Sequence, residues 1–253
     1  MELNYKKFGE GQPLIILHGL FGSLDNWQTI AKELADHFDV YIVDQRNHGH
    51  SPHSDEFNYD VMAADLNEFI DQHDLKNPYI LGHSMGGKTA MKFALNHTDR
   101  WEKLIVVDIA PKSYPVHHDQ IIEGLKAINV EQLESRGEAD KKLAEYVDEK
   151  GVRQFLLKNL SRNNNGGFKW KINLAVIAEN IEAIGEGMEE QLAIEKDVLF
   201  IRGENSDYIK DKDNILIVQH FPNSKVVTIK DAGHWIHAEK PEEFVETVKS
   251  FLR

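Results

Sequence analysis

Ser84 lies at the centre of a short motif that could carry covalent chemistry. The motif, residues 82–86 (GHSMG), fits the pattern G-x-S-x-G; it follows the apolar run 79–81 (YIL) and opens a helical pattern. A sharp turn between a strand and a helix exposes the serine in a strained conformation, and the helix N-terminus favours the oxyanion that forms after attack on a carbonyl. The bare pattern is common, but this setting predicts that Ser84 is a nucleophile for acyl transfer.

His234 is the histidine that the sequence places as general base. A neutral imidazole can take the proton of a serine and return it to the leaving group near neutral pH. The chain has 13 histidines, so a structural role is expected for most of them. His234 follows the last apolar run, 226–229 (VVTI), which is the place of the base in the chain order Ser, Asp, His. We interpret four other histidines as hydrogen bonders that shape loops: His18, His48, His83 and His237.

Two aspartates compete for the third position of a catalytic triad. Asp108 directly follows an apolar run, whereas Asp207 lies in the loop after a later one. The imidazolium that forms during acyl transfer needs one fixed carboxylate, and a strand end holds a side chain more firmly than a loop does. We therefore favour Asp108, with Ser206 as a supporting hydrogen bonder and Asp207 as the alternative acid. Either aspartate could instead be structural, as a turn residue or a solvated charge.

The loop 18–22 (HGLFG) supplies candidates for the oxyanion hole. It follows the apolar run 13–17, and an oxyanion hole of this kind takes one N–H from such a loop and one from the residue after the nucleophile. We assign the two donors to Leu20 and Met85, with Phe21 as the fallback for the first. The segment 44–51 (DQRNHGHS) is expected to brace this loop by hydrogen bonds and has no catalytic role in our interpretation.

These residues need a scaffold that brings several loops together, and the chain alternates short apolar runs with helical patterns. The predicted buried strands are 13–17, 40–43, 79–81, 104–107, 198–201 and 226–229. The predicted helices between them are 26–37, 59–74, 86–96 and 241–252. Strands separated by helices indicate an α/β fold, with a mostly parallel sheet covered on both faces and ligands at the carboxyl ends of the strands.

The alternation stops between residues 111 and 196. This stretch is charged, with helical patterns around 121–128, 143–147, 152–160 and 174–184 and a predicted turn at 163–167 (NNNGG). It follows a strand directly, which favours a helical cap inserted over the edge of the sheet. The core would then consist of segments 1–110 and 197–253. The alternative is a few extra helices packed beside the sheet. Aromatic residues in or facing the cap are the predicted walls of a substrate pocket, although they could simply pack the cap: Phe21, Tyr114, Phe168, Trp170 and Trp235.

Taken together, these motifs resemble those of one family, the small bacterial acyl esterases related to animal abhydrolase domain-containing protein 11, within the α/β-hydrolase superfamily. The motifs are 18–23 (HGLFGS), 82–88 (GHSMGGK), 107–111 (VDIAP), 203–206 (GENS) and 233–241 (GHWIHAEKP). The resemblance implies a carboxylesterase or acyl-thioesterase with a helical cap and without a cofactor. It implies that Asp108 is the acid, assisted by Ser206. Many α/β-hydrolases instead place the acid where Ser206 stands, and Asp207, one residue further on, is a departure from the family pattern.

Composition excludes several other functions. The 253 residues carry 29 Lys and Arg against 42 Asp and Glu, a net charge of −13 that repels nucleic acids and anionic membranes. Cysteine is absent, so disulfides and thiolate chemistry are excluded. We expect no metal site, because we interpret the lone cluster His117-His118-Asp119 as an exposed cap segment. We also expect no signal peptide and no membrane span. The expected protein is cytoplasmic, a monomer or homodimer, and acts on a small-molecule acyl ester or thioester.

Two other functions fit the same motifs. One is a serine-dependent C–C bond hydrolase or lyase of the same fold, which needs charged cap residues to hold a carboxylated substrate. The other is a ligand-binding protein that keeps an intact triad. A serine at position 84 disfavours dehalogenases and epoxide hydrolases, which use an aspartate nucleophile.

Overall fold

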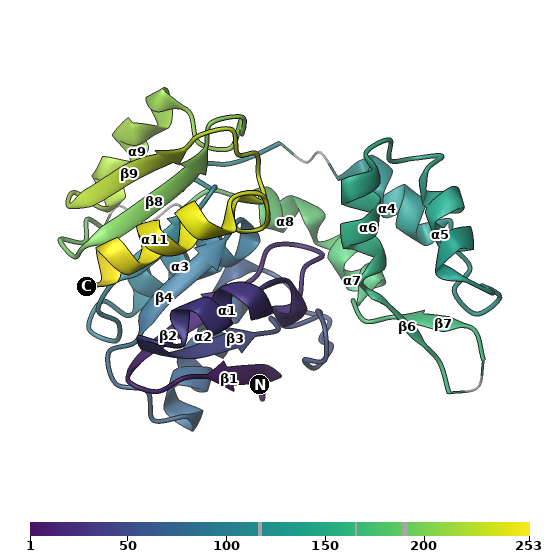
Figure 1. The fold of residues 1–253 in the computed structure, drawn as a ribbon, viewed down its shortest axis with the longest axis horizontal. Helices are drawn as coiled ribbons and strands as arrows, with labels where there is room; N and C mark the ends of the chain where they lie inside the picture. Colours follow the sequence, from purple (N-terminus) through teal and green to yellow (C-terminus); the bar gives the residue numbers. More distant parts are fainter. Residues whose placement is uncertain (116–117, 165, 189–191) are drawn as a thin grey trace.

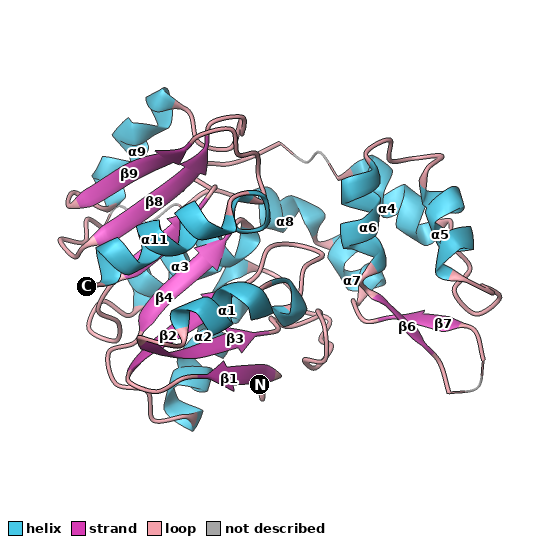
Figure 2. Ribbon diagram, viewed as in Figure 1, coloured by secondary structure: helices cyan, strands magenta, loops and turns pink. Residues whose placement is uncertain are grey.

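The protein is built around a twisted, mostly parallel sheet (Figures 1 and 2). The computed structural model describes residues 1–115, 118–164, 166–188 and 192–253. Within them, seven strands have the order β1-β3-β2-β4-β5-β8-β9. Their bounds are β1 Tyr5–Phe8, β2 Gln12–Leu17, β3 Phe38–Val43, β4 Tyr79–His83, β5 Leu104–Val107, β8 Val198–Gly203 and β9 Ser224–Ile229. All neighbours pair in parallel except β1 and β3.

Helices cover both faces of this sheet. On one face lie α1, Gln28–Leu34, and α11, Pro241–Leu252; on the other lie α2, Tyr59–Gln72, α3, Met85–Asn96, and α9, Asn214–His220 (Figure 1). Successive residues of β2 alternate between the two cores, so that Ile15 packs with the α2 and α3 side and Ile16 with the α1 and α11 side. Burial on both faces explains why these strands read as continuous apolar runs.

A mainly helical segment stands between β5 and β8. Its elements are α4 Asp119–Lys126, α5 Arg136–Leu143, α6 Lys150–Leu157, β6 Leu160–Arg162, β7 Phe168–Trp170, α7 Leu174–Glu179 and α8 Ile181–Gly185. Figure 1 shows the segment beyond the arrowheads of the parallel strands, with α8 nearest the sheet. It has an apolar cluster of its own, which Phe21, Tyr59 and Met85 join from the sheet side. The cap boundaries at 111 and 196 remain a prediction.

The structure corrects several element predictions. The helix expected at 143–147 lies earlier, because α5 ends at Leu143, and the one expected at 152–160 ends at Leu157 before β6 begins. The helical pattern at 174–184 is divided into α7 and α8 at Asn180. The predicted turn at 163–167 joins the hairpin strands β6 and β7. Gly167 in this turn has a φ of 68°, and a Cβ there would lie 2.4 Å from the oxygen of Glu131. Asn165 is outside the described residues. The edge strand β1 was not predicted, since it is mostly exposed and carries two lysines.

None of the helices in the described part of the chain combines the length and apolar character needed to cross a bilayer.

Candidate active site

Ser84 occupies a strained turn between β4 and α3. Its φ is 52° and its ψ is −117°, a conformation that non-glycine residues rarely adopt. The turn is possible because two glycines allow close backbone contact: a Cβ on Gly82 would lie 2.2 Å from the oxygen of Gly86, and one on Gly86 would lie 2.4 Å from the oxygen of Leu17. The N–H of Ser84 donates to the oxygen of Val107 at 2.9 Å, which ties the turn to β5. The half-buried serine thus sits at the N-terminus of α3, where negative charge is favoured.

Asp108 is the carboxylate that contacts His234. Its Oδ2 lies 2.7 Å from Nδ1 of His234, and the side chain is fully buried. Two further donors hold it: the N–H of Gly203 reaches Oδ1 at 3.2 Å, and the hydroxyl of Ser206 donates to Oδ2. A carboxylate in this position can fix the tautomer of an imidazole and stabilise the imidazolium.

Asp207 points away from this contact. Its side chain is 93% exposed and pairs with Lys210 at 3.2 Å, within the same loop. The structure therefore brings Asp108 to His234 and Ser206 to Asp108, and it leaves Asp207 in solvent.

Aromatic rings hold His234 in place. Tyr208 stacks on its imidazole with the ring centroids 4.1 Å apart, and Nε2 of His83 donates to the backbone oxygen of His234 at 2.9 Å. Burial, reinforced by the neighbouring His234 and His237, keeps the pKa of His83 well below its usual value, so this support is uncharged. Tyr208 was not among the predicted site residues, and no pattern in the sequence marks it.

The backbone N–H groups of loop 18–22 differ in whether they already have an acceptor. The N–H of Phe21 donates to Nε2 of His48 at 3.2 Å, so the fallback oxyanion donor is already engaged. The N–H of Leu20 has no acceptor among the described residues, and Met85 begins α3, where a first-turn N–H has no partner in the helix. A Cβ on Gly19 would lie 3.3 Å from the Cβ of Ser84, which places this loop beside the serine. These contacts favour Leu20 over Phe21 as the donor.

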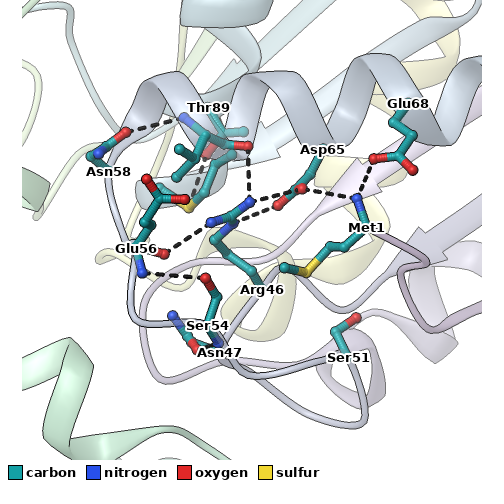
Figure 3. Close-up of polar contacts among 12 residues, drawn as sticks. Met1, Arg46, Asn47, Ser51, Ser54, Glu56, Asn58, Asp65, Glu68 and Thr89 are labelled. Atoms are coloured by element: carbon teal, nitrogen blue, oxygen red, sulfur yellow. Dashed lines mark hydrogen bonds and ion pairs between the residues drawn. The ribbon is translucent and has the colours of Figure 1, made fainter.

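The segment 44–51 braces this loop. Asp44 accepts the N–H of Leu24 at 2.7 Å, and burial together with the neighbouring His18 lowers the pKa of His48 to about 3, so His48 is a neutral acceptor at ordinary pH. Figure 3 shows Arg46 directed at Asp65 of α2, where its Nε and Nη2 lie 2.6 and 2.9 Å from the two carboxylate oxygens. The bidentate pair anchors the segment to the helix layer.

A cavity of about 560 Å³ opens over the site, between the sheet edge and the inserted segment. Ser84 and His234 both line it, and so do two predicted wall residues, Phe21 and Trp235. A second cavity of about 60 Å³ also reaches Ser84 and has the predicted Tyr114 in its wall. The two cavities share a border at the serine, the arrangement that a bound ester would need on either side of its carbonyl carbon.

Phe168 and Trp170 line neither of these two cavities, so the cavities give no support to their predicted role as pocket walls. Both belong to β7, on the hairpin that lies away from the sheet (Figure 1). Phe168 is buried inside the insert, with the guanidinium of Arg162 4.9 Å above its ring. The large cavity is walled instead by residues of α6 such as Val152 and Phe155, which recur at helical spacing.

His118 also departs from its prediction as an exposed residue. It is half-buried, lines both cavities and lies with its ring centroid 6.2 Å from that of Phe21. His117 falls outside the described residues.

Comparisons with known proteins agree with this geometry. Residues 12–136 match the family described as alpha/beta hydrolase fold. A putative esterase/lipase of Haemophilus influenzae is 39% identical over 240 residues, which cover 94% of this chain and 82% of that protein. The mouse sn-1-specific diacylglycerol lipase ABHD11 is 38% identical over 247 residues, or 94% of this chain and 80% of that one.

Among solved structures, a marine microorganism esterase superposes with a TM-score of 0.97 at 48% identity and covers 99% of both chains. Relatives at this level of identity over most of the chain establish the family. The chain belongs to the α/β-hydrolase family, among carboxylic ester hydrolases that include ABHD11 and small bacterial esterases.

Proposed function

We propose that this ester hydrolase is a serine carboxylesterase that cleaves small-molecule acyl esters or thioesters through an acyl-enzyme on Ser84. The observation that carries the proposal is the contact of 2.7 Å between His234 and the buried Asp108, together with a strained serine that lines the same cavity as His234. A buried carboxylate, an imidazole and an exposed hydroxyl are the groups that serine-based acyl transfer requires.

In the first half of the reaction, Nε2 of His234 takes the proton of Ser84 as Oγ bonds to the carbonyl carbon of the substrate. The carbonyl oxygen becomes an oxyanion, which accepts the N–H groups of Leu20 and Met85. The carbon–oxygen or carbon–sulfur bond to the leaving group then breaks. His234 returns the proton to the departing oxygen or sulfur, and the acyl group stays on Ser84.

Water completes the reaction. His234 takes a proton from water as the water oxygen attacks the acyl carbon, and Ser84 leaves with that proton when the carboxylic acid is released. Asp108 holds the Nδ1 proton of His234 throughout, and the hydroxyl of Ser206 keeps the carboxylate in place. The steps balance without a cofactor or a metal ion.

The cavity lining favours an ester over the carboxylated substrate of a C–C bond hydrolase or lyase. A carboxylate needs a cation, yet the described residues that line either cavity include no lysine or arginine. The charged side chains in the wall of the large cavity are acidic, Asp148 and Glu149. The relatives named as esterases and lipases support the same substrate class.

Replacement of the nucleophile tests the proposal. Ser84→Ala should lower kcat on nitrophenyl acetate by at least ~10³-fold while circular dichroism and Tm stay close to those of the parent, because one hydroxyl is lost from a turn. Ser161→Ala is the matched control, since it removes a hydroxyl from β6, outside both cavities. Turnover by Ser84→Ala near the parent rate would end the proposal. A folded parent protein that binds esters and retains the product without turnover would favour a ligand-binding role.

A further inference from the structure

The two cavities that meet at Ser84 are unequal, and only one of them reaches His234. Both are lined by Ser84, Leu20 and Tyr208, but the described lining of the small cavity of about 60 Å³ does not include His234. The large cavity of about 560 Å³ does include it. Under the mechanism proposed above, on which this inference rests, the asymmetry determines which cavity receives which part of an ester.

The leaving group of an ester must lie next to the general acid that protonates it. In serine-based acyl transfer the acid is the imidazole, here His234, so the leaving oxygen faces the large cavity. The acyl chain extends from the other side of the carbonyl carbon. With the carbonyl oxygen directed at the N–H groups of Leu20 and Met85, the space left for this chain is the small cavity.

We infer that the small cavity is the acyl pocket, and that the enzyme hydrolyses esters with a short acyl chain and a much larger leaving group. A water molecule occupies roughly 15–30 Å³ by common measures of cavity volume, so about 60 Å³ accepts on the order of two to four methylene-sized groups. The chains that fit run from acetyl to about butyryl. The large cavity can take an extended alcohol.

Apart from His118 and Tyr208, which also line the large cavity, the walls of the small cavity are apolar, even where Tyr59 and Tyr114 form them. The hydroxyl of Tyr59 donates to the oxygen of Ile184 at 2.8 Å. That of Tyr114 donates to the oxygen of Tyr208 at 2.6 Å and accepts the N–H of Ala110 at 2.8 Å. With both hydroxyls engaged, the rings present hydrocarbon to the cavity. Aliphatic side chains complete the wall: Ile109, Ile181 and Ile184.

The pocket is also held rigidly. Lys88 of α3 is buried; its ammonium donates to the oxygen of Gly185 at 3.2 Å and to that of Glu186, and lies 4.9 Å from the ring centroid of Tyr114. These contacts join the end of α8 to the helix that begins after Ser84. A wall fixed in this way cannot yield readily to a longer chain, which makes its size a determinant of specificity.

Two ester series test the assignment, one with graded acyl chains on nitrophenol and one with acetate on graded alcohols. For the parent, kcat/KM should fall about tenfold or more from butyrate to octanoate, because the longer chain does not fit, and should change only a few-fold along the alcohol series. Ile184→Ala enlarges the small cavity and should raise the octanoate-to-acetate ratio about tenfold. Val152→Ala makes the same kind of change in the large cavity and should alter the alcohol series alone.

Ile181→Ala serves as a second enlarged variant if Ile184→Ala does not fold, as judged by its Tm. A parent that prefers octanoate to butyrate, or an acyl profile that responds to Val152→Ala and not to Ile184→Ala, would overturn the assignment. Such an outcome in an enzyme that still depends on Ser84 leaves the proposed function intact, whereas activity in Ser84→Ala removes the basis for both.

Discussion

At the scale of single residues, the clearest choice is between two carboxylates. Asp108→Asn should lower kcat by about 10³- to 10⁴-fold, because the amide cannot hold the required tautomer of His234 or stabilise its charged form. Asp207→Asn makes the same chemical change on a side chain that is 93% exposed and pairs with Lys210. It should cost less than about threefold, as surface changes generally do. Steady-state kinetics on one nitrophenyl ester measure both.

The reverse result, a large loss at Asp207 with a small one at Asp108, would mean that the loop rearranges when substrate binds. Comparable partial losses would mean that the two carboxylates substitute for each other. Either result would contradict the role proposed for Asp108.

The sequence was sufficient for the residues that follow strands and insufficient for those of the cap. The turn at Ser84 and the contact between Asp108 and His234 could be predicted because the positions of these residues follow from chain order and strand ends, which short apolar runs make visible. Phe168 and Trp170 could not be placed, because whether an aromatic residue faces a cavity depends on how the inserted helices pack. Tyr208 stacks on His234 from a loop without regular periodicity, so no sequence pattern predicts that it belongs to the site.

At the scale of elements, the turn between β4 and α3 depends on glycines with no room for a side chain. Gly86→Ala would place a Cβ 2.4 Å from the oxygen of Leu17 and 2.6 Å from that of His18, so backbone must move. We expect a loss of about 2 kcal/mol or more in the free energy of unfolding, together with a loss of activity, since the displaced strand end carries the oxyanion loop. Thermal or urea unfolding measures the first and ester hydrolysis the second.

Gly151→Ala is the matched control on α6, where a Cβ would meet no atom within 4 Å outside the helix backbone. Alanine is the better helix former, so this variant should gain up to about 1 kcal/mol. If Gly86→Ala were as stable and active as Gly151→Ala, the tight turn would not be needed to position Ser84.

Elements of the sheet were easier to predict than those of the insert for a physical reason. A strand buried on both faces, such as Val198–Gly203, is apolar along most of its length, whereas β1 is exposed and charged and gives no such signal. In the insert, β6 and β7 have three residues each, too few for a period of two to be recognised beside helical patterns.

At the scale of the whole molecule, three loops from the carboxyl ends of β4, β5 and β9 meet under the inserted segment. The same packing buries several histidines beneath the site. Burial, with smaller contributions from neighbouring charges, lowers the pKa of His48 and of His237 to about 3, and the pKa of His18 and His83 is lowered as well. The centre of the fold therefore contains neutral imidazoles that resist protonation.

This burial predicts acid sensitivity. Below pH ~6.5 the unfolded chain binds protons on His48 and His237, while the folded chain does not until pH about 3, so the free energy of unfolding falls as the pH is lowered through this window. Each such histidine contributes up to ~1.4 kcal/mol per pH unit. We expect the free energy of unfolding, measured with urea between pH 6.5 and 5, to depend less steeply on pH in His237→Phe than in the parent. The phenylalanine keeps a ring stacked on Trp27 but cannot bind a proton. An unchanged slope would show that His237 is not the group that titrates.

The measurement closest to the central claim is the identification of the nucleophile by covalent trapping. An organophosphonate probe reacts with an activated serine, and peptide mass spectrometry locates the adduct. We predict one adduct per chain, on Ser84, formed at a rate that drops with Asp108→Asn and absent in Ser84→Ala. An adduct on another residue, or labelling of Ser84→Ala at the parent rate, would contradict a mechanism based on Ser84, His234 and Asp108.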